Sequence, residues 1–345
     1  MVFTQVNLSP RKKKLLMALA EAYIREVRPI SSQYLQHYVE ASSATIRNEL
    51  RELEALGFVK QVHSQGGRVP TTYGYRVYVD ELISHVKVEP EQVKSLVRLF
   101  RRVGRELEEL VHSILERLSL ESNYLAFVTI PSPSSISVKS ISLIEVDDYE
   151  FVIVLVTDSG VTQSRTIKSP TLVKNLMLGL LNERLNNYCR GKKLVEINFS
   201  ELKKVLHTFA KDLPVIYTQV EALLKTALRP KNRVIFTEAY ALLAQPEFEE
   251  PGKFKRVMET ITDEGSFLEI VDKVKEKEVD AIIGEESGHE ELDDVSILVS
   301  PYESEGKLGL VGPTRLQYHR TIPLVFNVAE ALRRALAEEK GGCKK

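Results

Sequence analysis

The chain has 345 residues, of which 43% are hydrophobic and 28% are charged, as in an ordinary globular protein of two or three domains. No apolar run approaches the roughly 18 residues of a membrane span, and the N-terminus carries no signal-peptide pattern. The two cysteines, Cys189 and Cys343, stand far apart, which excludes a zinc site of the usual spacing and a disulfide framework. We therefore expect a cytoplasmic protein without a membrane partner.

The first predicted element is a helix that begins at Ser9-Pro10 and runs to about Glu26. Serine is a common N-cap, and proline suits the first position of a helix. A second helix opens at Ser31 or Ser32 after a short connection. The residues expected on the buried face of this second helix are Leu35, Tyr38 and Val39.

A third helix follows the turn at residues 41–43, and its two faces differ in chemistry. Apolar residues from Ile46 to Leu56 recur at helical spacing and form one buried stripe. The opposite face has the residue types that read base edges in the major groove of double-stranded DNA, because Asn pairs with adenine and Arg with guanine. Ser42 or Ser43 can cap the helix, and its first amides suit a phosphate. The candidate contacts are Ser43, Ala44, Thr45, Arg47, Asn48 and Arg51.

These three helices have the spacing of a helix-turn-helix, and the next segment adds a wing. Residues 58–63 alternate as a strand, residues 64–67 form a turn, and Arg68-Val69 returns as a second strand. We interpret this region as a winged-helix DNA-binding domain. We expect Arg68 to lie at the tip of the wing and to contact a phosphate or the minor groove.

Basic residues gather in the same region. Residues 1–79 hold eleven Lys or Arg and six Asp or Glu, a net charge of +5, so the rest of the chain is acidic. The run Arg11, Lys12, Lys13, Lys14 lies in the first turn of a helix, where cations oppose the helix dipole. A phosphate partner would offset that cost, and a solvated charge run is the alternative. We treat these four residues as candidate contacts to the DNA backbone.

Three segments resemble the HrcA family of bacterial heat-inducible transcription repressors. They are Gly66–Asp80, Ser43–Leu50 and Gly309–Leu316, and the match is collinear over nearly the whole chain. The resemblance implies a homodimeric repressor of heat-shock (chaperone) operons that binds an inverted-repeat operator, the CIRCE element, and is released on heat stress. It also implies a GAF-like body with an inserted dimerisation domain, and activity maintained by the GroE chaperonin.

After the DNA-binding region, the pattern predicts a long amphipathic helix from Glu91 to about Leu118. This helix either packs on a sheet of its own chain or forms a two-helix dimer seam. Strand patterns follow at residues 124–130, 138–146, 151–157 and 161–168, and turn residues join the last three into an antiparallel meander.

A helix ending near Tyr188 comes next, then a mostly helical stretch with one short strand, residues 234–236. Three further strands, 280–283, 295–300 and 307–311, precede a final helix. The fold class is therefore α+β, with a GAF-like α/β body interrupted by an insertion. The predicted domains are a winged helix-turn-helix domain (1–88), a GAF-like domain in two parts (89–190 and 266–340) and an inserted, mostly helical dimerisation domain (191–265).

Two segments invite an enzymatic interpretation. Residues 284–291 place carboxylates beside His289, but only one histidine lies there, so an acidic surface loop is the better interpretation. Residues 309–315 lack the glycine and lysine spacing of a phosphate loop. Arg315 and His319 are candidate contacts between domains. We expect no enzyme, catalytic residue, metal site or cofactor. The alternative to a heat-released repressor is a winged-helix regulator controlled by a small ligand in its GAF-like domain.

Overall fold

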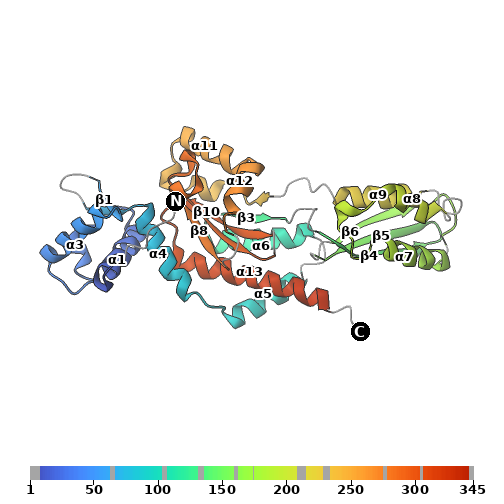
Figure 1. Cartoon of the computed structure of the whole chain (residues 1–345), viewed down its shortest axis with the longest axis horizontal. Coiled ribbons are helices and arrows are strands. Elements are labelled where there is room, and N and C mark those ends of the chain that lie inside the picture. Colours follow the sequence, from blue (N-terminus) through green and yellow to red (C-terminus); the bar gives the residue numbers. More distant parts are fainter. Residues whose placement is uncertain are drawn as a thin grey trace.

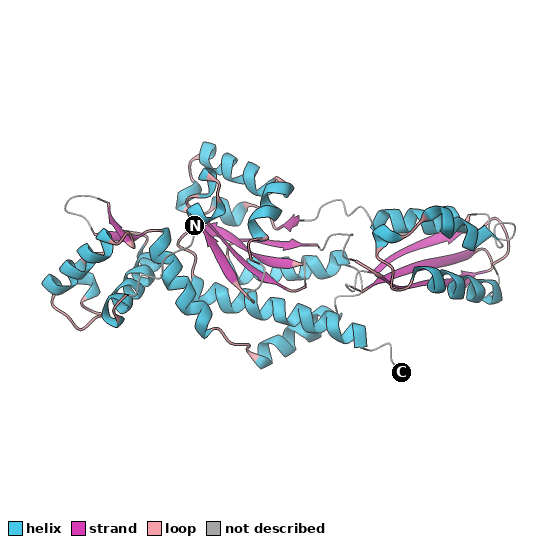
Figure 2. Cartoon of the chain, viewed as in Figure 1, coloured by secondary structure: helices cyan, strands magenta, loops and turns pink. Residues whose placement is uncertain are grey.

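The computed structural model describes residues 8–62, 67–102, 107–130, 136–158, 162–173, 175–207, 215–227, 234–274, 278–303 and 306–341. Three parts follow one another along the long axis of the molecule (Figures 1 and 2). We call them the head (residues 8–85), the body (residues 90–130 and 234–341) and the insertion (residues 136–227). No helix in the described ranges is long and apolar enough to cross a membrane.

The head is a helix-turn-helix followed by a small antiparallel wing. Its elements are α1 (Pro10–Glu26), α2 (Ser32–Leu35), α3 (Ser43–Ala55), β1 (Val59–Gln61), β2 (Arg68–Pro70) and α4 (Thr72–His85). The predicted N-caps are confirmed, since each cap side chain accepts a hydrogen bond from a backbone N–H of its helix. These caps are Ser9, Ser31 and Ser42, and Thr71 caps α4 in the same way. The tip of the wing, residues 63–66, lies outside the described residues.

The core of the head contains the apolar stripes of α1 and α3, including Leu16, Leu50 and Leu53. The predicted stripe is wrong at Leu56, which is 47% exposed because α3 ends at Ala55. Leu35 and Val39 are buried in this core as predicted, but Tyr38 is 42% exposed and stacks on Tyr34. The prediction for Tyr38 is wrong because α2 is a single turn, so Tyr38 lies beyond its last residue.

The body is built on a five-stranded antiparallel sheet in the order β7-β3-β10-β9-β8. Its strands are β3 (Leu125–Thr129), β7 (Val234–Phe236), β8 (Asp280–Ile283), β9 (Val295–Pro301) and β10 (Lys307–Pro313). Side chains alternate between two cores, one on each face. One face packs on α5 (Pro90–Arg102), α6 (Leu107–Ser122) and α13 (Tyr318–Gly341). The other packs on α10 (Tyr240–Leu243), α11 (Pro251–Thr262) and α12 (Glu264–Val271).

The predicted helix over residues 91–118 is described as two helices, α5 and α6, and residues 103–106 between them lie outside the described ranges. Val93 of α5 and Leu118 of α6 are buried in the same core as β3 and α13. This confirms the interpretation that the segment packs on a sheet of its own chain.

The insertion is a separate layer of sheet and helices. The meander of β4 (Val138–Asp147), β5 (Glu150–Thr157) and β6 (Thr162–Lys168) forms its sheet, as predicted from the turns. Its helices are α7 (Asn175–Cys189), α8 (Phe199–Leu206) and α9 (Ile216–Ala227), and all three share one core with the sheet. In Figure 1 the strands run between α7 below and α8 and α9 above.

Strand β4 forms one edge of this sheet, and α7 closes that edge with two asparagines. Asn182 accepts a hydrogen bond from the Leu143 N–H at 2.6 Å and donates to the Leu143 carbonyl at 3.0 Å. Asn186 does the same for Ile141, at 3.0 and 2.7 Å. Each side-chain amide therefore replaces the backbone amide of a missing neighbouring strand.

The predicted limits of the insertion, 191–265, are wrong in both directions. The meander pairs with no strand of the body among the described residues, and it shares its core with α7, α8 and α9. Residues 234–274 belong to the body instead, because β7 pairs with β3 and because α11 and α12 cover the sheet. Alternating residues show that a strand has one buried face, but they do not show which helix covers it.

Candidate nucleic-acid interface

The outward face of α3 presents three polar side chains to solvent. Arg47, Asn48 and Arg51 are exposed, whereas Ile46 and Leu50 on the opposite face are fully buried. Within the described part of the chain, the three polar side chains make no hydrogen bond and no ion pair. Arg47 and Arg51 stand four residues apart, a spacing at which like charges destabilise a helix by about 0.2–0.5 kcal/mol. An anionic partner would relieve that repulsion.

The start of α3 is held by hydroxyl groups. Ser42 caps the helix by accepting the Thr45 N–H at 3.1 Å, and its Oγ lies 2.8 Å from Thr45 Oγ1. Ser43 Oγ lies 3.0 Å from Ser32 Oγ, which ties α3 to α2. Ala44 is exposed between them. Ser43 and Thr45 therefore lie at the end of α3 that meets α2, with their hydroxyls already sharing hydrogen bonds.

The basic run at the start of α1 is largely paired inside the head. Arg11 Nε donates to Glu49 at 2.6 Å, and Lys12 lies 2.5 Å from Glu52, both on α3. Lys13 pairs with Glu81 of α4, and this hydrogen bond lowers the pKa of the Glu81 carboxyl. A phosphate and solvent were the two partners expected for these cations. The carboxylates that pair with them are distant in sequence and leave no local pattern.

Lys14 differs from the other three cations of this run. Its side chain is exposed and makes no ion pair within the described ranges. Lys60 of β1 is exposed and unpaired in the same part of the structure. The available signal for Lys60 was a lysine in the first predicted strand of the wing, directly after the buried Val59.

Arg68 does not lie at the wing tip, and the predicted position of its side chain is wrong. The residue is only 8% exposed, and its Nε and Nη2 donate to Glu54 Oε2 of α3 at 3.1 and 2.9 Å. Its backbone exchanges two hydrogen bonds of 2.9 Å with Ile30. Arg68 is the first residue of a three-residue strand, so it joins the wing to α3 and to the segment before α2.

Strand β8 and the acidic segment after it contact the head. Glu286 and Asp280 both pair with Arg76 of α4. In the described part of the chain, no group of three His, Cys, Asp or Glu residues could hold a metal ion. Arg315 donates to Glu247 at 2.6 Å, and both residues belong to the body, so the predicted contact between domains through Arg315 is not formed by this pair. Arg76 is therefore a charged link between head and body.

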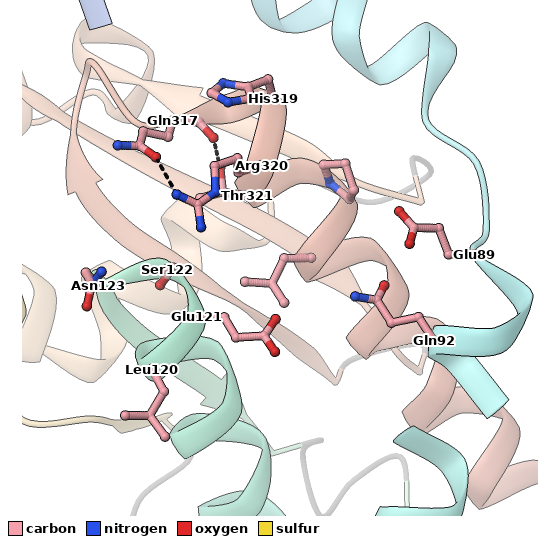
Figure 3. Close-up of a pocket in the computed structure, with 12 residues that line it drawn as sticks. Glu89, Gln92, Leu120, Glu121, Ser122, Asn123, Gln317, His319, Arg320 and Thr321 are labelled. Carbon is pink, nitrogen blue, oxygen red and sulfur yellow. Dashed lines mark hydrogen bonds between the residues drawn. The ribbon is translucent and has the colours of Figure 1, made fainter. Parts of the chain in front are cut away.

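The body also has a hollow of about 520 Å³ beside α6 and the start of α13. Figure 3 shows Arg320 and His319 extending from α13 and Glu121 from the end of α6. Arg320 donates to Gln317 at 3.3 Å. Gln92 Oε1, from α5, is buried without a hydrogen-bond partner among the described residues. The walls of this hollow are therefore polar and carry charges of both signs.

Two family descriptions match the chain. Residues 7–82 match the winged helix-turn-helix transcription repressor, HrcA DNA-binding family, and residues 108–322 match the HrcA protein C terminal domain. A heat-inducible transcription repressor HrcA from Halalkalibacterium halodurans is 30% identical over 96% of this chain and 98% of its own length. Another from Natranaerobius thermophilus is 29% identical over 97% and 99%.

A crystal structure described as that of a hypothetical protein has the same fold, with a TM-score of 0.65 and 20% identity over 96% of this chain and 98% of that one. The matching family is one of transcription repressors and not of enzymes, which removes the enzymatic interpretation of the acidic segment. The DNA-binding match, residues 7–82, covers α1, α2, α3, the strands of the wing and most of α4. With matches over both its head and most of its remaining length, the chain belongs to the HrcA family of heat-inducible transcription repressors.

Proposed function

We propose that this protein binds, as a cytoplasmic homodimer, to an inverted-repeat operator of the CIRCE type and represses heat-shock operons until heat releases it. The observation that carries this proposal is the outward face of α3. Arg47, Asn48 and Arg51 are exposed and unpaired in the described structure, and helix-turn-helix proteins place this face in the major groove.

The side chains of α3 divide between base reading and positioning. Arg47 and Arg51 have the fork that pairs with guanine, and Asn48 has the amide that pairs with adenine. The methyl groups of Ala44 and Thr45 suit thymine, while Ser43 at the helix start suits a phosphate. These contacts would determine the bases that each half-site requires.

Contacts to the DNA backbone come from cations around α3. Lys14 and Lys60 are exposed and unpaired in the described ranges, so they can bind phosphates without losing a partner. Arg11, Lys12 and Lys13 would first exchange a carboxylate for a phosphate, which reduces their net gain. Arg68 supports the wing instead of binding DNA.

A dimer brings two heads to the two halves of an inverted repeat, and we propose the open face of the insertion sheet as its interface. The buried face of this sheet packs on α7, α8 and α9. On the other face, Ile144 and Val146 of β4 are exposed, and the valines of β5 are half-buried. The cross-strand pairs on this face are Ile144 with Val152 and Ser142 with Val154. β-branched apolar residues on an open face suit a second, identical sheet stacked at about 10 Å.

The same apolar surface suggests how heat and a chaperonin would act. Joining two weak half-site contacts raises the effective concentration of the second, so separating the copies lowers operator affinity steeply. We propose that heating separates the copies or opens the body. The freed apolar face is the kind of surface that a chaperonin binds, and GroE would return the protein to its dimeric form.

The central test is a gel shift of the full chain on inverted-repeat DNA, on the same DNA with one half-site scrambled, and on unrelated DNA. We expect tight binding only to the intact repeat, loss of binding on mild heating, and recovery on cooling that GroE accelerates. Equal affinity for all three DNAs would overturn the proposed function. If DNA binding recovered at the same rate with and without GroE, the chaperonin would have no part in the proposed function.

The dimer surface has its own test by light scattering. Val154→Arg places a charge on the open face of both copies, and we expect a monomer that retains its circular dichroism spectrum. Lys204→Glu is the matched control, because Lys204 is exposed on α8, which packs against the other face. A Val154→Arg protein that stays dimeric would exclude this surface.

A second candidate function is control by a small ligand, and the hollow beside α13 favours it. Charges of both signs and the unpartnered Gln92 Oε1 suit a polar zwitterion better than an apolar ligand. A metabolite pool that releases the operator at constant temperature, with the release abolished in Arg320→Gln, would support this function.

A further inference from the structure

Helix α4 belongs to two cores at once, which makes the joint between head and body rigid. On one side Val77 packs against the core of the head. On the other side Tyr75 and Tyr78 are buried in the body core, where the ring centroids of both lie 6.3 Å from that of Tyr318. In Figure 1 α4 runs from the head down to the region of α13. The head is therefore packed onto the body through buried aromatic side chains.

Arg76, in the same helix, connects to the body through its whole guanidinium group. Its Nε donates to Glu286 Oε1 at 2.8 Å, and its Nη1 donates to Asp280 Oδ1 at 2.8 Å. Its Nη2 donates to the carbonyl of Ala281 and to Glu286. The side chains of Arg76, Asp280 and Glu286 are only 17%, 15% and 14% exposed. A guanidinium group that donates to several fixed acceptors holds its helix in one orientation. A single point charge, such as a lysine ammonium group, does not fix the orientation in this way.

The acceptors on the body are themselves held in place. Glu286 accepts the Ile283 N–H at 2.9 Å, and Lys273 donates to the Glu286 carbonyl at 2.9 Å. Gly284 has φ +50°, and a Cβ there would lie 2.6 Å from the Asp293 carbonyl oxygen and 3.1 Å from Thr72 Oγ1 of α4. The positive φ and the close Asp293 carbonyl favour glycine here, and its small size also leaves room for Thr72 at the start of α4. The acidic segment is therefore shaped to receive α4.

We infer that Arg76 is a positioning residue that fixes the direction of α3 relative to the body, and that it thereby sets the half-site spacing that the dimer accepts. The inference rests on the proposed binding of an inverted repeat by a homodimer. Each added base pair moves one half-site by about 3.4 Å and turns it by about 35° around the duplex. Two heads that are fixed to their bodies can follow only a small part of that movement.

The test measures operator affinity of the full chain on a series of inverted repeats whose half-site centres are moved apart one base pair at a time, over half a helical turn. We expect the natural protein to show a sharp optimum. Arg76→Met keeps the length of the side chain but removes the fork. We expect about tenfold lower affinity at the optimum, because the aligned state is populated for only part of the time, and a flattened spacing profile.

Two comparisons separate positioning from loss of structure. Single-base substitutions within a half-site should have the same effect on Arg76→Met as on the natural protein, since α3 is unchanged. Arg334→Met is the control, because it removes an exposed Arg–Glu330 pair near the far end of α13. Arg76→Lys should give a spacing profile between those of the natural protein and Arg76→Met. If circular dichroism shows that Arg76→Met does not fold, the profile of Arg76→Lys is the one that tests the role of Arg76.

The outcomes are distinct. A folded Arg76→Met protein, or Arg76→Lys in its place, with the natural spacing profile overturns the role of Arg76 and leaves the proposed function intact. Altered base preference within the half-site would also overturn it, since α3 itself would then have changed. A natural protein that prefers the intact repeat but shows no spacing preference overturns this inference alone. A natural protein that binds intact and half-scrambled repeats equally removes the proposed function and this inference together, and neither result needs a variant.

Discussion

The head has two basic surfaces that look alike in sequence and differ in structure. The first turn of α1 carries four consecutive cations, and three of them are paired with carboxylates of α3 and α4. The outward face of α3 carries only two arginines, and both are unpaired within the described residues. The number of charges is therefore a poor guide to which surface binds DNA, and the presence or absence of an internal partner is a better one.

Helix α3 accounts for two of the three pairs and for the unpaired arginines. Glu49 and Glu52 lie on the side of α3 that meets α1, where they pair with Arg11 and Lys12. Arg47 and Arg51 point away from that side, and the residue four positions after Arg51 is Ala55. The carboxylates of α3 are thus engaged with α1 and, through Glu54, with Arg68 of the wing, which leaves the arginines of α3 available to an external anion.

The largest effect should come from the buried cation of the wing. Arg68→Ala leaves Glu54 without its partner and should destabilise the head by about 2–3 kcal/mol, below the usual range for a buried pair because Glu54 is one-third exposed. Hydrogen exchange of the head amides measures this loss. Lys60→Ala on the neighbouring strand should leave exchange unchanged. If hydrogen exchange in Arg68→Ala were the same as in the natural protein, Arg68 would contribute no more to the stability of the head than the exposed Lys60.

The next effect concerns the base-reading face. Asn48→Ala and Arg51→Ala should each weaken operator binding by about 1–3 kcal/mol and relax the preference at one base position. Their melting temperatures should stay at the natural value, since neither side chain has an internal partner in the described structure. Unchanged affinity and base preference in both variants would show that α3 does not enter the groove in this orientation.

A smaller effect distinguishes paired from unpaired cations within α1. Lys14→Ala should reduce the slope of log affinity against log salt concentration by about 0.9, the value for one phosphate contact. Lys12→Ala should reduce the slope by less, because Lys12 already neutralises Glu52. Equal slopes in the two variants would mean that DNA displaces the internal carboxylate completely.

The smallest effect is a dependence of stability on pH. The hydrogen bond from Lys13 lowers the pKa of Glu81 below its ordinary value of 4.5. The pair therefore stabilises the head above pH 4.5, and this contribution disappears as the pH falls through the lowered pKa. The melting temperature of Glu81→Gln should approach that of the natural protein as the pH drops below 4.5. A difference that stays constant with pH would exclude this ionic contribution.

Local patterns predicted most elements of the fold, and partners distant in sequence account for what they missed. The predicted limits of α1 and of the strands at 234–236 and 280–283 match the structure, because caps, turns and periodicity are properties of a few consecutive residues. The unpaired face of α3 was also found, since opposite faces of a helix follow from its period.

Apart from Tyr38 and Leu56, which lie beyond the last residues of α2 and α3, the missed features depend on long-range contacts. Arg68 meets Glu54, and Lys13 meets Glu81, across 14 and 68 residues of sequence. The acidic segment after β8 was correctly assigned as non-enzymatic, but its link to Arg76 spans 210 residues and leaves no local signal. The limits of the insertion failed for the same reason, because only the shared core shows which sheet each helix covers.

The asparagines along β4 bear on what happens to a copy that has lost its partner. An uncovered edge strand is a template for further strands, and chains that pair in this way grow into ribbons. Asn182 and Asn186 already satisfy the backbone groups of Leu143 and Ile141 on that edge. Separated copies can then rejoin face to face but cannot polymerise through this part of β4. A repressor that comes apart on heating, as we propose, stays recoverable for the next cycle.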